Sequence, residues 1–136
     1  MNAVGTLMSE GEISLLEAFH NTFLYFIQEL NVLTWDAAKK WEWTGRWPCI
    51  AGEIQWEMRG YVEYILKHAG TFLAEPERTK IALFMDKMEN LPPDALLAGQ
   101  DTLNHPQWES LRNDARDLLE CLARQISENH SFLNDV

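Results

Sequence analysis

Apolar residues recur at intervals of three and four along most of this chain, which is the period of an α-helix buried on one side. The first stripe, from Glu10 to about Asn31, is wide enough to predict a deeply buried helix. Ser9 stands three residues before Glu12, a spacing typical of a capping box at a helix start. We therefore expect the first helix to begin near Glu10 and residues 1–8 to be flexible.

Further stripes and turn residues divide the rest of the chain. They predict long helices over 48–69 and 76–90 and from 106 onward, with short helical segments over 36–44 and 94–99. Thr34 or Asp36 suits the cap of the first short segment. Gly70 suits a left-handed cap after the second long helix, and Asn104 or His105 suits the cap of the last. Alternating β-branched runs, the usual sign of strands, are nearly absent.

These patterns predict one all-α domain over residues 1–136. It should be a helical bundle of four long helices plus one or two short ones. A chain of 136 residues with 46% apolar residues is long and apolar enough for one compact core. Because the predicted connections are short, we expect sequential helices to be antiparallel neighbours.

The charge is strongly acidic, with a formal net charge of −10 from 21 acidic and 11 basic residues. This argues against direct binding to nucleic acid or to an anionic membrane surface, both of which need basic faces. It is compatible with a basic protein partner. Residues 1–38 and 89–111 contain acidic residues but no Lys or Arg. Two interpretations stay open: one shared negative face, or two separate solvated helix faces.

Localisation signals are weak, and they favour a cytoplasmic protein. Cys49 and Cys121 are the only cysteines and form no C-x-x-C motif, so we expect both thiols to be free. The first residues lack the basic and apolar regions of a secretory signal. No apolar run approaches the roughly 18 residues that a membrane-spanning helix needs.

Five of the six tryptophans fall between Trp35 and Trp56. Trp41 and Trp43 are two residues apart, so on a helix they cannot share a face. Trp56 lies opposite the apolar side of its helix. We therefore expect some of these indoles to be exposed. Trp and Arg are enriched at the centres of protein interfaces. The candidate partner-binding residues here are Trp41, Trp43, Arg46, Trp47 and Trp56. The alternatives are a second small core, or a homodimer formed through the same segment.

A second candidate site is a metal centre of the ferritin-like kind. Glu17 and His20 form an E-x-x-H pair on one helix face, as in di-iron bundles. Glu57 and His68 lie along one edge of a later helix and would complete a mixed oxygen and nitrogen ligand set for iron, manganese or zinc. The di-iron pattern needs two E-x-x-H pairs, however, and this chain has only one.

Nothing in the sequence predicts catalysis or a bound cofactor. The chain has no G-x-S-x-G turn and no glycine-rich phosphate loop. The favoured hypothesis is a small non-catalytic protein of the inhibitor, immunity or adaptor kind. Its acidic residues Glu10, Glu12 and Glu17 would steer a basic partner, and its tryptophans would anchor it. A protein that imitates nucleic-acid phosphates is a special case of this hypothesis.

Overall fold

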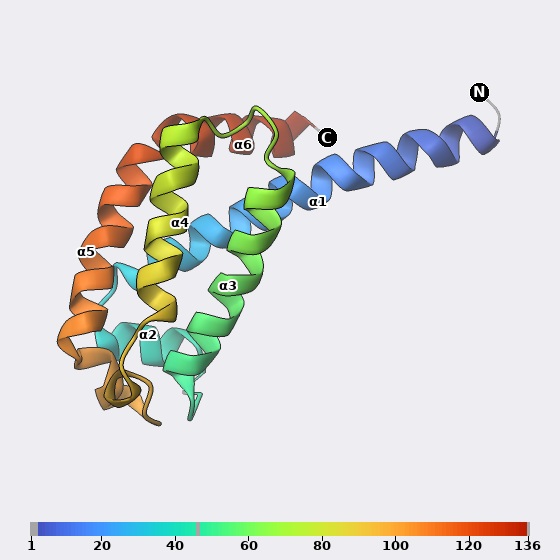
Figure 1. Ribbon diagram of the computed structural model, residues 1–136. Coiled ribbons are helices and arrows are strands. Elements are labelled where there is room, and N and C mark those ends of the chain that lie inside the picture. Colours follow the sequence, from blue (N-terminus) through green and yellow to red (C-terminus); the bar gives the residue numbers. More distant parts are fainter. Residues whose placement is uncertain (1–2, 46, 136) are drawn as a thin grey trace.

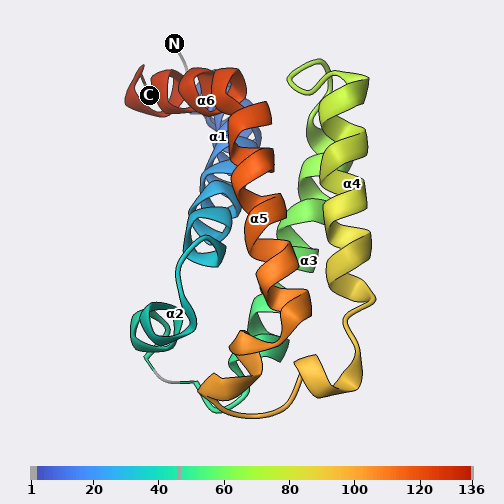
Figure 2. The same cartoon turned by 90° about the vertical axis from the view of Figure 1, so that its left-hand side faces the viewer.

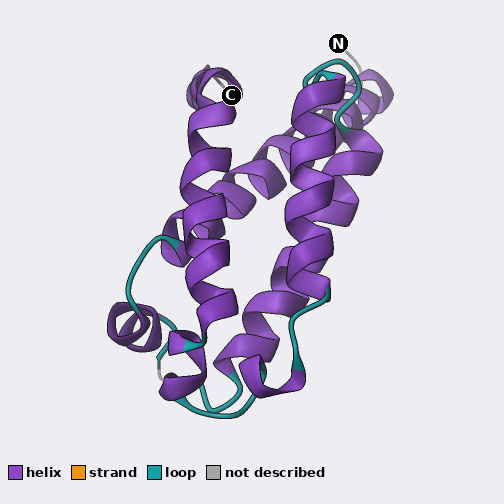
Figure 3. Cartoon of the chain, turned by 60° about the vertical axis from the view of Figure 1, so that its left-hand side comes forward, coloured by secondary structure: helices purple, strands orange, loops and turns teal. Residues whose placement is uncertain are grey.

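The computed structural model describes residues 3–45 and 47–135, and the side chains of residues 15–45 and 47–134. Within these ranges the chain forms helices and connecting loops and no strand (Figure 3). The prediction of an all-α helical bundle is confirmed. The α-helices are α1 (Ala3–Leu33), α2 (Ala37–Trp43), α3 (Ile50–His68), α4 (Glu75–Glu89), α5 (Pro106–Cys121) and α6 (Ala123–Asp135), and the 3-10 helices are η1 (Pro93–Ala95) and η2 (Gln100–Asn104).

Helices α3, α4 and α5 lie side by side, and each runs antiparallel to the one before it (Figures 1 and 2). The prediction of antiparallel sequential neighbours is confirmed for these three helices, although the connection from α4 to α5 is long and contains both 3-10 helices. Helix α1 crosses them diagonally and contacts α3, α5 and α6, while its N-terminal part projects away from the other helices (Figure 1). Helix α2 and the two 3-10 helices close one end of the bundle, and α6 lies across the other (Figure 2). None of the described helices combines the length and hydropathy that crossing a membrane requires.

The core forms where the apolar stripes meet. Helix α1 contributes four large side chains with no exposed surface, Phe23, Phe26, Leu30 and Leu33. The sixth tryptophan, Trp108, is also fully buried, and its indole Nε1 donates a hydrogen bond of 2.7 Å to the carbonyl oxygen of Ala95. This bond fastens η1 to α5 and satisfies the one polar atom of the indole.

Several predicted helix boundaries are confirmed. Asp36 caps α2, since its Oδ1 accepts a hydrogen bond of 2.8 Å from the Lys39 amide. Gly70 follows α3 with a φ of 54°, the left-handed conformation that glycine adopts most easily. His105 caps α5 through its Nδ1, which accepts from the Gln107 amide at 3.0 Å.

Two predicted helix starts are wrong. Helix α1 begins at Ala3, so Ser9 and Glu12 lie within the helix and form no capping box at its start. The predicted flexibility of residues 1–8 stays a prediction. Helix α3 begins at Ile50 with Cys49 at the cap position, so Pro48 precedes the helix.

The last apolar stripe is interrupted, against the prediction of one continuous helix. The chain turns at Leu122, whose φ and ψ are −94° and 9°, and α6 leaves in a different direction from α5 (Figure 1). Leu122 is buried and is neither glycine nor proline, so the local sequence carries no sign of a break. The turn allows α6 to pack against α1.

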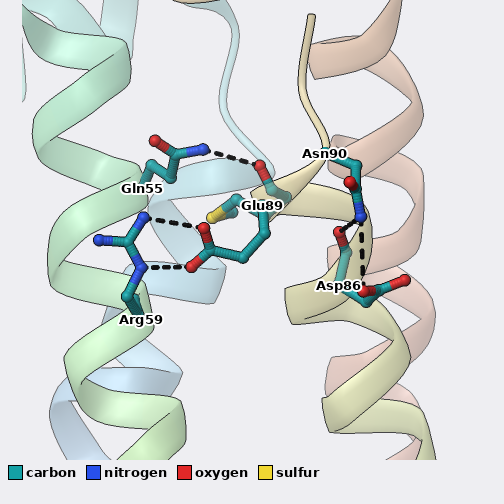
Figure 4. Close-up of polar contacts among 6 residues, drawn as sticks. Gln55, Arg59, Asp86, Glu89 and Asn90 are labelled. Carbon is teal, nitrogen blue, oxygen red and sulfur yellow. Dashed lines mark hydrogen bonds and ion pairs between the residues drawn. The ribbon is translucent and has the colours of Figure 1, made fainter.

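Helix α3 is held against α4 by polar contacts along one edge (Figure 4). Gln55 Nε2 donates to the Met88 carbonyl oxygen at 3.0 Å, and Arg59 forms a two-bond ion pair with Glu89. Residues 55 and 59 are one turn apart, so both face α4. The opposite edge of α3, which carries Glu57 and Tyr61, therefore faces α1.

Among the described side chains, Lys40 is the largest polar one in the interior. It lies on the inner face of α2 with 1% of its surface exposed. Burial is the main cause that lowers the pKa of Lys40 to about 8, helped by the nearby charge of Arg112 and opposed more weakly by that of Glu109. An ordinary lysine pKa applies in the unfolded chain, so the unfolded state binds more protons between about pH 8 and 10.5 and stability rises with pH through that window.

We predict that Lys40→Met stabilises the protein at about pH 7 by roughly 1–3 kcal/mol, because it removes the cost of burying an ammonium group. The gain should shrink towards pH 10, where the wild-type amine is neutral. Urea unfolding of both proteins at the two pH values measures this, with the exposed Lys80→Met as the matched control. A gain of the same size at both pH values would contradict the assignment.

Candidate functional site

The tryptophans of the 35–56 segment divide between surface and core. Trp43 and Trp56 are 67% and 68% exposed, and Trp47 is 38% exposed. Trp41, in contrast, packs against the core. The prediction that Trp41 and Trp43 face different ways is therefore confirmed, as is the outward direction of Trp56. The alternative prediction, that the tryptophans form a second small core, fits Trp41 but does not fit Trp43 or Trp56.

Of the remaining predicted partner-binding residues, only the side chain of Glu17 falls within the described ranges. Arg46 and the side chains of Glu10 and Glu12 lie outside the described residues. Glu17 is half-buried on α1, and at 1.5 Å of rise per residue it lies about 18 Å along the helix from Glu29. A role of the three glutamates in steering a partner stays a prediction.

The exposed tryptophans instead border a pair of contacts between α1 and α3. The rings of Tyr25 and Tyr61 lie 6.3 Å apart at an interplanar angle of 35°. One turn after Tyr25 on α1 and one turn before Tyr61 on α3, the carboxyl groups of Glu29 and Glu57 are in hydrogen-bond contact. The two helices thus match a tyrosine with a tyrosine and a carboxyl with a carboxyl.

Two hollows adjoin these contacts, and Tyr61 lines both. The first, of about 310 Å³, is also lined by Tyr25, Glu29, Trp35 and Trp43, and the second, of about 490 Å³, by Trp56 and Glu57. Trp35 meets Trp43 edge to face at 5.5 Å. We call this surface the aromatic–carboxyl patch, and its members are Tyr25, Glu29, Trp35, Trp43, Trp56, Glu57 and Tyr61.

The electrostatics of the aromatic–carboxyl patch are set by the two glutamates. Burial, the charge of Glu57 and the hydrogen bond to Glu57 together raise the pKa of Glu29 to about 8, with burial as the largest cause. At neutral pH the pair therefore holds one proton and one negative charge. Burial also raises the pKa of Tyr61, with smaller contributions from both glutamates, so this phenol stays neutral.

Two of the described cations next to the aromatic–carboxyl patch have contacts of their own. Lys39 Nζ lies 4.1 Å from the centre of the Trp35 ring, a cation–π contact. Arg59 lines the second hollow but is paired with Glu89 on the α4 side of α3. Of the described residues in the acidic run 89–111, Glu89, Asp94 and Glu109 contact Arg59, His105 and Arg112.

The four candidate metal ligands are not brought together. His20 Nδ1 is 2.6 Å from Asn129 Oδ1 on α6, and its ring stacks on Phe132 at 3.9 Å. Glu57 contacts Glu29, and His68 packs against Tyr64. Glu17 completes no set either, since no three His, Cys, Asp or Glu side chains among the described ones are grouped as metal ligands. His20 serves to join α1 to α6.

Sequence reasoning did not select Tyr25, Glu29, Trp35 or Tyr61, although a signal for three of them is present. Tyr25 and Glu29 form Y-x-x-x-E on one helix, and Glu57 and Tyr61 form E-x-x-x-Y on another. Each pair lies on one helix face, and the reversed order matches two helices that run in opposite directions. The pattern becomes informative only once the two helices are known to be neighbours.

The carboxyl pair generates a prediction about stability. Between about pH 4.5 and 8 the folded state binds more protons than the unfolded state, so Glu29 makes stability fall as the pH rises through this window. Glu29→Gln keeps a hydrogen-bond donor towards Glu57 without the charge. We expect it to match the wild type near pH 5 and to be more stable by at least about 2 kcal/mol near pH 9.

Urea unfolding at both pH values tests this, with the exposed Glu120→Gln on α5 as the control for the same chemical change. Equal stability of Glu29→Gln and wild type near pH 9 would show that Glu29 ionises without cost.

Comparison with known proteins finds no match to this chain among protein-family models, curated proteins or solved structures. What the aromatic–carboxyl patch does is therefore argued from its geometry and chemistry alone.

Proposed function

We propose that this chain is a small non-catalytic protein-binding domain of the inhibitor, immunity or adaptor kind, which binds a basic partner through the aromatic–carboxyl patch. The observation that carries the proposal is the exposure of Trp43 and Trp56, about two thirds each, beside a half-buried carboxyl pair. Burying a large apolar side chain contributes roughly 1.5–3 kcal/mol. Both indoles are exposed in the free chain, so their burial against a partner would stabilise a complex.

The charges of the chain support a basic partner. The net charge is −10, and the carboxyl pair places acidic groups between the exposed rings. Aromatic anchors surrounded by complementary charge are typical of interfaces in which a few residues carry most of the binding energy.

The openness of the patch favours binding over catalysis. A pair of carboxyls that shares one proton also serves as acid and base in hydrolases, but such sites exclude water to strengthen their electrostatics. Here the indoles that border the pair are mostly exposed. The unpaired thiols of Cys49 and Cys121 are compatible with the reducing cytoplasmic setting that the proposal includes.

The first prediction of the proposal is that capture of a partner depends on the indoles. Tagged wild type should retain a basic protein from its source lysate at about 50 mM salt and lose part of it at about 500 mM, as charges become screened. Trp43→Ala and Trp56→Ala should retain much less. With the purified partner, each should dissociate at least about tenfold faster, as expected of interface hot spots.

Leu97→Ala is the matched control, since Leu97 is 60% exposed outside the aromatic–carboxyl patch. If the tryptophan variants capture the same protein as well as Leu97→Ala does, the patch is not the binding surface. If wild type captures nothing but forms a dimer that both tryptophan variants lose, the patch serves self-association instead.

A second prediction separates steering from anchoring. Glu10, Glu12 and Glu17 lie along the N-terminal half of α1, away from the patch. Reversing their charges should slow association with the purified partner at low salt and leave dissociation nearly unchanged, because distant charges act mainly on the encounter. Stopped-flow kinetics measure both rates. An effect confined to dissociation would place these residues in direct contact with the partner.

A further inference from the structure

The hollow between α1, α3 and the Trp35–Trp43 pair offers a combination of groups that suits one cationic side chain. It provides two tyrosine rings inclined at 35° and the carboxyl group of Glu29 from α1. The Glu29 carboxyl is hydrogen-bonded to that of Glu57 on α3, which lines the neighbouring hollow. Its volume of about 310 Å³ is at the lower limit of small-molecule pockets, so it has room for a side chain and little more.

We infer that this hollow is an arginine subsite, in which a guanidinium group of the basic partner stacks on Tyr25 and Tyr61 and donates hydrogen bonds to Glu29 and Glu57. The inference rests on the proposed function and names the partner's chemistry at one point of the same surface.

The choice of arginine over lysine follows from geometry. A guanidinium group is planar, so it stacks on aromatic rings, and its fixed fork of five N–H donors reaches two acceptors at once. A lysine ammonium is a compact and strongly hydrated charge that gains less from a flat aromatic surface. The two carboxyls come from different helices yet touch, so a single fork can bridge them.

Binding at this subsite should release a proton. In the free protein the carboxyl pair holds one proton, because burial and Glu57 raise the pKa of Glu29 to about 8. A guanidinium group favours two carboxylates, since it supplies the positive charge that the proton supplies in the free state. At about pH 7 binding should therefore release close to one proton, and affinity should rise up to about tenfold per pH unit until the pH passes about 8.

Other ionisable groups around the hollow do not account for such a release. From α1 and α3 the ionisable groups that line the hollow are Tyr25, Glu29 and Tyr61, and the pKa of Tyr61 is raised away from this range. Glu57 contacts Glu29 from the neighbouring hollow. From α2, Lys39 lies over the ring of Trp35, one of the tryptophans that line the hollow. Gln28 and Asn31, which also line the hollow, carry no charge.

The test uses hexa-arginine and hexa-lysine peptides, which carry equal charge, as probes of the full chain. Isothermal titration calorimetry at about 50 mM salt and about pH 7, in two buffers of different ionisation enthalpy, yields affinity and protons released together. We expect hexa-arginine to bind at least about tenfold more tightly than hexa-lysine and to release close to one proton.

Glu29→Gln should abolish the proton release and weaken hexa-arginine binding at least about tenfold, as expected for loss of one partner of a desolvated charge pair. It retains the hydrogen bond to Glu57, so circular dichroism should show a folded protein. The exposed Glu120→Gln should bind and release protons as the wild type does.

Three results would overturn the inference. Wild type could release no proton, Glu29→Gln could release as many as wild type, or hexa-lysine could match hexa-arginine in both quantities. These are distinct from failure of the proposed function. A partner whose capture depends on Trp43 but whose binding releases no proton would leave the proposed function standing and remove the subsite. Hexa-arginine binding that releases a proton, without any captured partner, would support the subsite and count against the proposed function.

Discussion

The structure depends on the burial of helix α1 against several helices at once. Its apolar stripe is wide, with Phe23, Phe26, Leu30 and Leu33 fully buried, and it contacts α3, α5 and α6. A helix buried over so much of its circumference has few positions left for polar side chains, and those at the edges of the stripe become partly desolvated. Each of these polar groups then needs a partner from the helix that covers it.

The two edges of α1 meet this requirement in different ways. On the α6 side, two hydrogen-bond contacts join His20 to Asn129. His20 Nδ1 lies 2.6 Å from Asn129 Oδ1, and Asn129 Nδ2 donates a bond of 3.0 Å to the His20 carbonyl oxygen. On the α3 side, Glu29 meets a second carboxyl, Glu57, and the contact is satisfied only when one proton is shared. The first arrangement is a stable joint between helices. The second is complete only under conditions that keep the proton bound.

Local signals predicted most of the fold, and contacts between distant segments account for what they missed. The α2 cap at Asp36, the left-handed Gly70 and the start of α5 at His105 depend on nearby residues, and all three are confirmed. The turn at Leu122 has no local cause and is explained by the packing of α6 on α1.

The candidate site follows the same division. The exposure of Trp56 follows from helical geometry alone, and it was predicted. Glu57 was assigned to a metal set because the register between α1 and α3 cannot be deduced from either helix by itself. The structure pairs it with Glu29 and not with Glu17. A shift of one turn between the helices would have changed that partner, which is why residue type and spacing could not decide it.

The buried ionisable groups also explain how the patch relates to the stability of the chain. Glu29 and Lys40 have pKa values moved in opposite directions, each to about 8. The contribution of Glu29 to stability falls as the pH rises towards 8, and that of Lys40 increases only above it, so the two together disfavour folding most near pH 8. Lys40 lies inside, where no partner can reach it. Glu29 lies beside exposed aromatic rings, where a cation has access to it. In the proposed complex a guanidinium group replaces its proton, so binding would relieve the desolvation that weakens the free protein.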